Sequence, residues 1–274
     1  MKSRNPESGR PAYPAEIVLH PDWWNAREGI VFDEDFFFHP ARRVEDEGRM
    51  ERALYERWGE YGLGSKTPDP VPALGAVHLA AGFLLSGMFG CRIDYAPGAA
   101  PQVVAADRPN LDFSEEDAFA SPIWRKFTSL VENLKARHGR VRGDVNWGGI
   151  LNIALDVRGQ AILTDFFDRP DEVSRFFTVI RNVIEKVTSY IEAETGTTSI
   201  SVNRITRFFP EPIFLHSECS HTMISEDVYK TFLRCFDLAW SETRRPFGIH
   251  YCGADPHRYG DAFAEIPNLD FLDL

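Results

Sequence analysis

The sequence predicts an α/β fold of the (β/α)8 TIM-barrel type that is incomplete toward its C-terminal end and follows an N-terminal helical segment. From residue 71 onward, apolar β-type runs alternate with helical periodicities, a pattern that predicts βαβ units and a parallel sheet. The 274 residues suffice for one large α/β domain. Neither G-x-G-x-x-G nor G-x-x-x-x-G-K-[ST] occurs, which favours a closed barrel over a nucleotide-binding doubly wound sheet.

Residues 1–70 are predicted to form a segment that packs on a barrel domain at residues 71–274. Repeated prolines divide this segment into short pieces, and its aromatic residues indicate contact with the barrel. Residues Glu45–Tyr61 predict a helix, because apolar side chains recur there at a spacing of four. The positions behind these predictions are Pro11, Pro14, Pro21, Pro40, Trp23, Trp24, Phe36–Phe38, Met50, Leu54 and Trp58.

The middle of the chain offers strand candidates on either side of a long helix. Arg142–Asn146 predicts a short strand, Gln160–Phe167 a strand or buried turn, and Thr197–Val202 a β-branched strand. Between the last two, Asp168 is expected to cap a helix that has Pro170 in its first turn and ends at Gly196. Its apolar stripe is Val173, Phe176, Phe177, Ile180, Ile184, Val187 and Ile191.

The C-terminal region repeats the alternation. Strands are predicted at Ile213–His216, Phe247–Tyr251 and Leu269–Leu274, and a short helix at Arg258–Phe263. Ser225 is expected to cap a further helix, whose buried side is Val228, Phe232, Phe236 and Trp240.

The number of strand candidates falls short of the eight that a closed barrel needs. We therefore expect the last strands to be missing after Leu274. The sheet edge left there is expected to favour self-association or poor solubility.

The charge balance excludes some classes of partner. A net charge of −11 disfavours binding to nucleic acid or to an anionic membrane surface. Met1–Pro14 has no apolar run of the signal-peptide type, and Val77–Phe89 is too short and too interrupted by glycine to span a bilayer. We expect a soluble, cytoplasmic protein that acts on a small-molecule substrate. The protein could form homo-oligomers.

Four cysteines in a chain of this length are reduced thiols and not a disulfide scaffold. Cys91, near a strand, and Cys235, within a predicted helix, are expected to be small buried hydrophobic residues. Cys219 and Cys252 stand in polar surroundings and are candidate metal ligands.

Three predicted strand ends carry chemistry-bearing side chains, and a barrel would bring them to one mouth. They are His216–His221 (HSECSH), His250–Gly253 (HYCG) and the pair Asn203–Arg204. In H-x-C, the side chains at i and i+2 of an extended strand point the same way, and thiolate and imidazole are ligands that zinc prefers. His250 and Cys252 are therefore predicted zinc ligands, although an H-x-C pair taken alone is weak evidence.

The neighbouring residues allow more than one role. Cys219 or Glu218 could complete the metal site, with His216 and Glu218 as catalytic candidates. His216 and His221 could instead be hydrogen-bond partners of the ligands. Arg204 could form a structural ion pair with Glu218.

The segments FLHSECSHTMISEDVYKTFLRCFDLAW (214–240) and FGIHYCGADPHRYGDAFAEIPNLDFLDL (247–274) resemble the uroporphyrinogen decarboxylase superfamily. The likeness rests on the Met223–Ser225 step into a helix with Tyr229 and Phe232, on the H-x-C-G strand end, and on the final L-D-F-L-D strand. Gln160–Phe177 is a softer match, and the first 90 residues carry little likeness.

The resemblance implies a (β/α)8 barrel and one of two activities. One branch decarboxylates uroporphyrinogen without metal. The other comprises cobalamin-dependent methyltransferases, whose zinc is held by an H-x-C pair and a later cysteine. The decarboxylase signature R-Q-A-G-R is absent from residues 1–90, which favours the second branch. That later cysteine does not occur here, so Cys219 is the candidate third ligand.

The predicted function is zinc-dependent transfer of a methyl group between a corrinoid and a thiol. A partner protein could carry the corrinoid. Asn203 and Arg204 are predicted to bind an anionic part of the substrate. The alternatives are a metal-free decarboxylase of a tetrapyrrole or other polycarboxylate, and a non-catalytic barrel that binds a corrinoid or metal.

Overall fold

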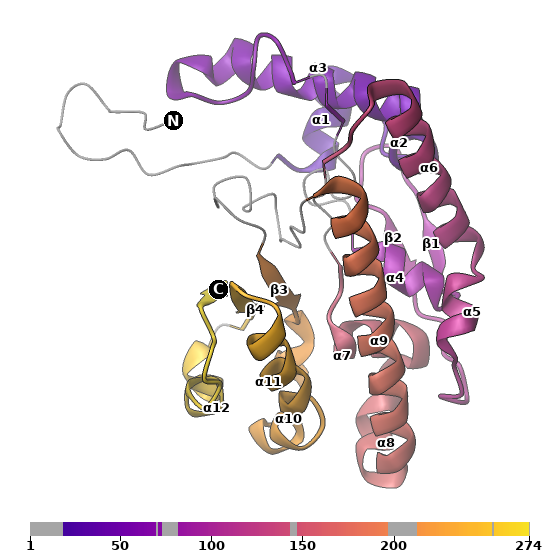
Figure 1. Cartoon of the computed structure of the whole chain (residues 1–274), viewed down its shortest axis with the longest axis vertical. Helices are drawn as coiled ribbons and strands as arrows, with labels where there is room; N and C mark the ends of the chain where they lie inside the picture. Colours follow the sequence, from indigo (N-terminus) through magenta and orange to yellow (C-terminus); the bar gives the residue numbers. More distant parts are fainter. Residues whose placement is uncertain are drawn as a thin grey trace, which may run out of the picture.

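The computed structural model describes residues 19–69, 71–72, 82–142, 147–196, 213–253 and 255–273. This part of the chain is a helix-rich α/β protein with a three-stranded parallel sheet toward the C-terminus and a two-stranded antiparallel ribbon in the first half. In Figure 1, the N-terminal helices lie at one end and the parallel sheet with its helices lies near the other.

The N-terminal segment forms three helices, α1 (Pro21–Glu28), α2 (Glu34–Phe38) and α3 (Pro40–Trp58). The predicted helix Glu45–Tyr61 is confirmed in α3, which starts earlier, and residues 59–61 form the 3₁₀ turn η1 (Gly59–Tyr61). The earlier start has two causes. The ring Nδ1 of His39 caps the helix by accepting a hydrogen bond from the N–H of Arg42, and Pro40 favours the first position of a helix.

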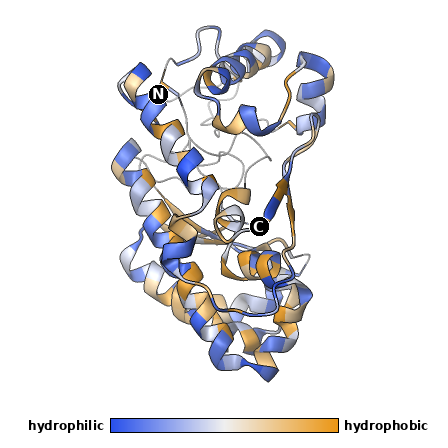
Figure 2. Cartoon of the chain, turned by 90° about the vertical axis from the view of Figure 1, so that its right-hand side faces the viewer, coloured by the Kyte–Doolittle hydropathy of each residue, from blue (hydrophilic) through white to orange (hydrophobic). Residues whose placement is uncertain are grey.

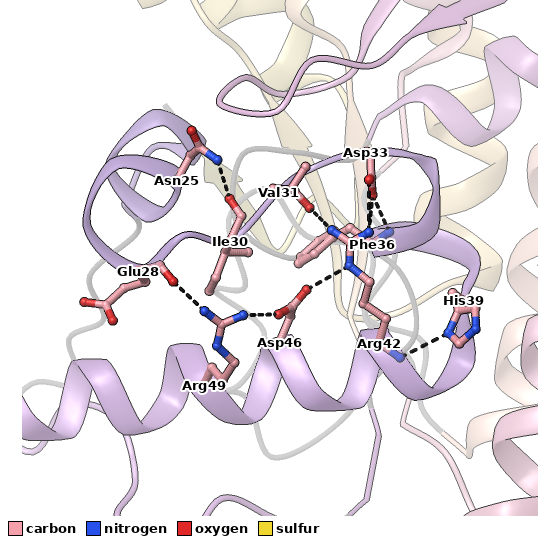
Figure 3. A network of polar contacts seen from close by, with 10 residues as sticks. All are labelled: Asn25, Glu28, Ile30, Val31, Asp33, Phe36, His39, Arg42, Asp46 and Arg49. Atoms are coloured by element: carbon pink, nitrogen blue, oxygen red, sulfur yellow. Dashed lines mark hydrogen bonds and ion pairs between the residues drawn. The ribbon is translucent and has the colours of Figure 1, made fainter.

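A polar network ties these three helices together (Figure 3). Arg42 donates to Asp33 at 3.0 Å and to Asp46 at 3.3 Å, and Arg49 donates to the other oxygen of Asp46 at 2.8 Å. The same arginines donate to the carbonyls of Val31 and Glu28. Arg42 and Arg49 therefore fix the connections between α1, α2 and α3.

The aromatic residues on which the packing prediction rests are buried or half-buried, whereas Tyr55 and Tyr61 of the same segment are exposed. Trp24 and Phe36 are fully buried in a cluster with Met50, and Phe38 and Ile123 pack against both this cluster and the main core. The boundary predicted at residue 70 lies outside the described residues, so the division into two domains stays a prediction.

The central part is mostly helical. It comprises α4 (Phe83–Met88), β1 (Arg92–Asp94), β2 (Gln102–Val104), α5 (Glu115–Phe119), α6 (Pro122–His138), α7 (Ile150–Arg158), η3 (Gly159–Ala161), α8 (Ile162–Asp168) and α9 (Pro170–Thr195). The long helix α9 buries its entire predicted stripe and ends at Gly196, which adopts the left-handed conformation at φ 69°.

Two predictions for this part are wrong. Gln160–Phe167, predicted as a strand or a buried turn, forms η3 and α8, because Ile162 and Phe166, four residues apart, are buried on one helical face. Asp168 is the last residue of α8, and α9 begins after Arg169 without a side-chain cap.

The C-terminal part contains the parallel sheet β3 (Phe214–Ser217), β4 (Phe247–His250) and β5 (Phe271–Asp273), in that order. This confirms three predicted strands to within two residues at their ends. The connections are η5 (Cys219–Met223), α10 (Glu226–Phe232), α11 (Arg234–Thr243), η6 (Pro256–Tyr259) and α12 (Gly260–Ala264).

The helix after Ser225 differs from the prediction in two respects, its continuity and its buried side. Ser225 caps it as expected, accepting from the N–H of Val228, but the helix breaks at Leu233 into α10 and α11. The break turns Tyr229 and Trp240 fully inward and leaves Val228, Phe232 and Phe236 half-buried.

The α/β class with a parallel sheet is thus confirmed, whereas the described strands form a three-stranded and a two-stranded sheet and do not close into a barrel. The predicted strand Thr197–Val202, and all of Arg142–Asn146 except Arg142, lie outside the described residues. Hydrophobic residues gather along the packed helices in Figure 2, with hydrophilic residues on outward faces. In the described part, no helix has the length and hydropathy to cross a membrane.

Candidate metal centre and adjacent pocket

The ends of β3 and β4 bring together Cys219, His250 and Cys252. Parallel pairing sets Ser217 opposite His250, so the residues that follow the two strands emerge at the same sheet edge. The two sulfurs and an imidazole nitrogen all lie within 4.8 Å of one another. Cys252 Sγ is 2.7 Å from His250 Nε2 and 3.2 Å from Cys219 Sγ. One small ion can reach all three atoms.

The third strand orients the imidazole of this cluster. Asp273 on β5 is the register partner of His250, and its carboxylate lies 3.1 Å from His250 Nδ1. When the imidazole is neutral, this contact holds its proton on Nδ1, and the lone pair of Nε2 is then directed at the thiols. Metal-binding histidines commonly have such a carboxylate behind them.

The electrostatics of the three groups differ. Burial opposes ionisation of Cys219, but hydrogen bonds from His250 and Cys252 outweigh it and lower the pKa of this thiol. Burial and the neighbouring Cys219 raise the pKa of Cys252. Burial lowers the pKa of His250, but Asp273 and Cys219 outweigh it and raise the value to about 11. Without a metal, Cys219 is therefore the thiol that ionises first.

Glu218 is fully buried, and its carboxylate binds the N-terminus of α7. It accepts hydrogen bonds from the N–H groups of Leu151 at 2.7 Å and Asn152 at 3.1 Å. These are N–H groups that the helix itself leaves unpaired, and the helix dipole favours a negative charge there. Glu218 thereby fixes the start of η5, where Cys219 lies.

His216 is also fully buried and lies between two carboxylates. Its Nδ1 is 2.7 Å from Asp237 Oδ1, and its Nε2 is 3.3 Å from the N–H of Ile150 and 3.5 Å from Glu218 Oε2. Burial lowers its pKa, but Asp237 and Glu218 outweigh this and raise the value to about 9. In this position His216 joins β3, α7 and α11.

Asn152 and Gly149 strengthen the same junction and were missed by sequence reasoning. The amide of Asn152 donates to the Ser217 carbonyl at 2.9 Å and accepts from the Ser220 N–H at 3.0 Å. The N–H of Gly149 also donates to Ser217, and a Cβ at Gly149 would lie 2.5 Å from Glu218 Oε2. The glycine pair before the apolar run of α7 was the available signal.

His221 lies outside the Cys219–His250–Cys252 cluster. Its imidazole is fully buried among Tyr229, Tyr259 and Phe263, and neither ring nitrogen has a hydrogen-bond partner among the described residues. Burial lowers its pKa to about 4. A neutral, packed imidazole is consistent with a structural role.

A pocket of about 600 Å³ opens beside Cys219. It runs along α7 and is also bounded by α4, β2 and η5. Its lining residues are Gly82, Phe83, Pro101, Val103, Ala105, Asp107, Gly148, Asn152, Leu155, Asp156, Gly159, Gln160, Cys219, Ser220 and Met223. A ligand in this pocket would therefore reach the exposed thiol of Cys219.

The remaining predicted positions have mixed outcomes. Asn203 and Arg204 lie outside the described residues. Cys91 is buried as expected, whereas the expectation that Cys235 is buried is wrong. The break at Leu233 starts a new helix whose inward residues are Asp237, Trp240 and Ser241, so Cys235 faces outward.

Comparison with known proteins shows a likeness of fold. No family model and no curated protein matches the chain. Among solved structures, a methyltransferase from Methanosarcina mazei is similar, with a TM-score of 0.62 and 13% sequence identity. The match covers 96% of this chain and 72% of that one. At this identity, the likeness shows that the two chains share a fold.

Proposed function

We propose that this protein is a zinc-dependent methyltransferase of the uroporphyrinogen decarboxylase superfamily, which moves a methyl group between a corrinoid and a thiol. The observation that carries the proposal is the cluster of Cys219, His250 and Cys252, whose Cys219 also lines the 600 Å³ pocket. The shared fold with a methyltransferase supports it. The proposal includes closure of the parallel sheet into the superfamily's barrel.

The donor set fits zinc. Two thiols and an imidazole are the soft and borderline ligands that this ion prefers, and three protein ligands leave a fourth position for a substrate atom. When bound, zinc would stabilise the deprotonated form of an incoming thiol at neutral pH. In the proposal, Cys219, His250 and Cys252 hold the ion.

The surrounding residues would position the ligands. Asp273 holds the tautomer of His250, and Glu218 fixes the loop of Cys219 through the N-terminus of α7. His216 stays in the proposal as support for Glu218. Its predicted catalytic role, and that of Glu218, would require contact with substrate. Asn203 and Arg204 remain proposed substrate-binding residues, and a corrinoid-carrying protein remains the proposed partner.

The decarboxylase alternative has less support. Decarboxylation of a polycarboxylate needs several basic side chains around the substrate. Within the described part of the chain, the charged residues that line the pocket are Asp107 and Asp156, and no lysine or arginine lines it. Two carboxylates would repel such a substrate.

The proposal is tested by methyl transfer from methylcobalamin to a small thiol. Zinc-loaded protein is expected to produce the thioether and to bleach the methylcobalamin spectrum, and His250→Ala/Cys252→Ala is expected to do neither. Cys235→Ser is the matched control, since this exposed thiol lies outside the cluster. A double variant as active as wild type would contradict the proposal.

A further inference from the structure

The pocket beside Cys219 is lined by acidic side chains to which the proposed methyl transfer assigns no role. Two carboxylates, Asp107 and Asp156, line it together with the amides of Asn152 and Gln160. No ion pair is formed by either aspartate within the described part of the chain. Other aspartates of the protein have guanidinium partners, as Asp165 has with Arg158 at 2.7 Å.

We propose that this pocket selects a substrate that carries an ammonium group, which Asp156 binds together with Asp107 while the thiol of the substrate points to Cys219. The part of the inference that places a thiol at Cys219 rests on the proposed function. The preference for an ammonium group depends only on the residues that line the pocket.

The helix α7 runs along the pocket. Asn152, Leu155 and Asp156 lie within α7 at spacings of three and four residues and therefore share one face, while Gly148 precedes the helix and Gly159 follows it. Asn152 is hydrogen-bonded to Ser220, next to Cys219, and so marks the thiol end. Asp156 follows one turn later, about 6 Å further along the axis. A short carbon chain can span this distance.

The carboxylate of Asp156 is anchored but has acceptor capacity left. Its Oδ2 accepts from the hydroxyl of Ser86 at 2.6 Å, and Ser86 is fully buried. Burial raises the pKa of Asp156. A cationic ligand is attracted more strongly to a half-buried carboxylate than to an exposed one, because water screens the attraction between the two charges less.

Asp107 closes the other end of the pocket. Gly159 adopts φ 69°, and a Cβ at this position would lie 2.1 Å from Asp107 Oδ1. Glycine therefore allows the Asp107 carboxylate to sit against the C-terminal end of α7. The side chains of Phe83, Val103, Leu155 and Met223 supply apolar walls between the two ends.

This ligand class differs from the anionic group expected at Arg204, which lies outside the described residues. A substrate site for an anion and a substrate site for an ammonium group predict opposite orders of affinity for ligands that have the same size and differ in charge. A sulfonate or carboxylate would face two like charges in the pocket, whereas an ammonium would face two opposite charges.

The test compares three ligands of one size on the purified protein. Binding of propylammonium, 1-propanol and propionate is measured by ligand-observed NMR titration. Cysteamine, 2-mercaptoethanol and 3-mercaptopropionate are measured in the same way on zinc-loaded protein. The ammonium member of each series is expected to bind about 10- to 100-fold more tightly than the neutral one.

Asp156→Asn keeps the acceptor for Ser86 and is expected to abolish the ammonium preference, with a smaller loss in Asp107→Asn. Asp112→Asn, at an exposed aspartate outside the pocket, is expected to keep it. The wild-type ligand series needs no variant, so it tests the inference even if Asp156→Asn fails to fold.

Equal binding of the three ligands, or a preference for the anion, would overturn the inference and leave zinc binding untouched. Ammonium preference with propylammonium in a protein that binds no zinc would support the pocket's ligand class while the proposed function fails.

Discussion

Asp273 is the residue on which the predicted orientation of His250 depends. The carboxylate holds Nδ1 at 3.1 Å, so its removal frees the ring to rotate and to change tautomer. We expect Asp273→Ala to weaken zinc binding by about 10- to 100-fold, as is typical when the partner of a metal-binding histidine is lost. Asp273→Asn, which keeps an acceptor, is expected to lose less.

Competition with a chromophoric chelator measures this affinity. Asp261→Ala, at an exposed aspartate of α12, is the control and should match wild type. Zinc affinity in Asp273→Ala equal to that of the control would show that the His250–Asp273 contact does not serve the metal.

A second prediction at this scale concerns the buried pair His216–Asp237. The folded-state pKa of His216 is about 9, above its ordinary value of 6.5. The pair therefore contributes stability that is fully present below about pH 6.5 and is lost as pH rises through about 9. The contribution is on the order of 3 kcal/mol.

Urea unfolding of chelator-treated protein at about pH 6.5 and about pH 9.5 tests this. Wild type is expected to lose more unfolding free energy across this span than His216→Gln, because only wild type carries the titrating imidazole. Parallel losses in the two proteins would rule out the charged pair.

At the scale of elements, the residue that ends α9 allows the energetic cost of a left-handed backbone conformation to be measured without a steric clash. Gly196 has φ 69° and open space around its Cβ position, so Gly196→Ala changes the backbone energy and adds no clash. We expect a loss of about 1 kcal/mol in unfolding free energy.

Gly260→Ala is the matched control. This glycine has φ −55° and equally open surroundings, so alanine should be neutral or slightly stabilising there. Chemical denaturation of the two variants measures the difference. Equal stability of both would show that Gly196 is not held in the left-handed conformation.

The elements also show what the sequence alone could predict. Helices α3 and α9 follow from periodicity, because each has one buried face. Strands β3, β4 and β5 follow from short apolar runs, of which β3 and β4 are buried along their whole length. The segment 160–167 could not be assigned in this way. A short apolar run fits a strand or a helix equally well, and only packing of Ile162 and Phe166 decides for α8.

The residues of the site also fall into those that local sequence spacing could predict and those that it could not. His250 and Cys252 are two residues apart on one strand end, so local spacing predicted that they would meet. Cys219 was a candidate from its own strand end and joins them through the pairing of β3 and β4. The parts played by Asp273, Asn152 and Asp156 arise from contacts between distant elements, which spacing within one segment cannot predict.

At the scale of the whole molecule, a metal at this site would bridge β3 and β4, with β5 attached through Asp273. A ligand that binds the folded state alone stabilises it by about 2.7 kcal/mol when its concentration is 100 times the dissociation constant. We expect zinc to raise the thermal unfolding midpoint of wild type and a chelator to reverse this. His250→Ala/Cys252→Ala should show no such response, and an equal shift in both proteins would mean that zinc acts elsewhere.

The most direct test of the account is the zinc content of the purified protein, measured by elemental mass spectrometry beside variants of the cluster. We predict about one zinc per chain in wild type and in Cys235→Ser, and none in Cys219→Ala/His250→Ala/Cys252→Ala. A folded wild-type protein that holds no zinc after reconstitution, or a triple variant that retains it, would contradict the metal centre.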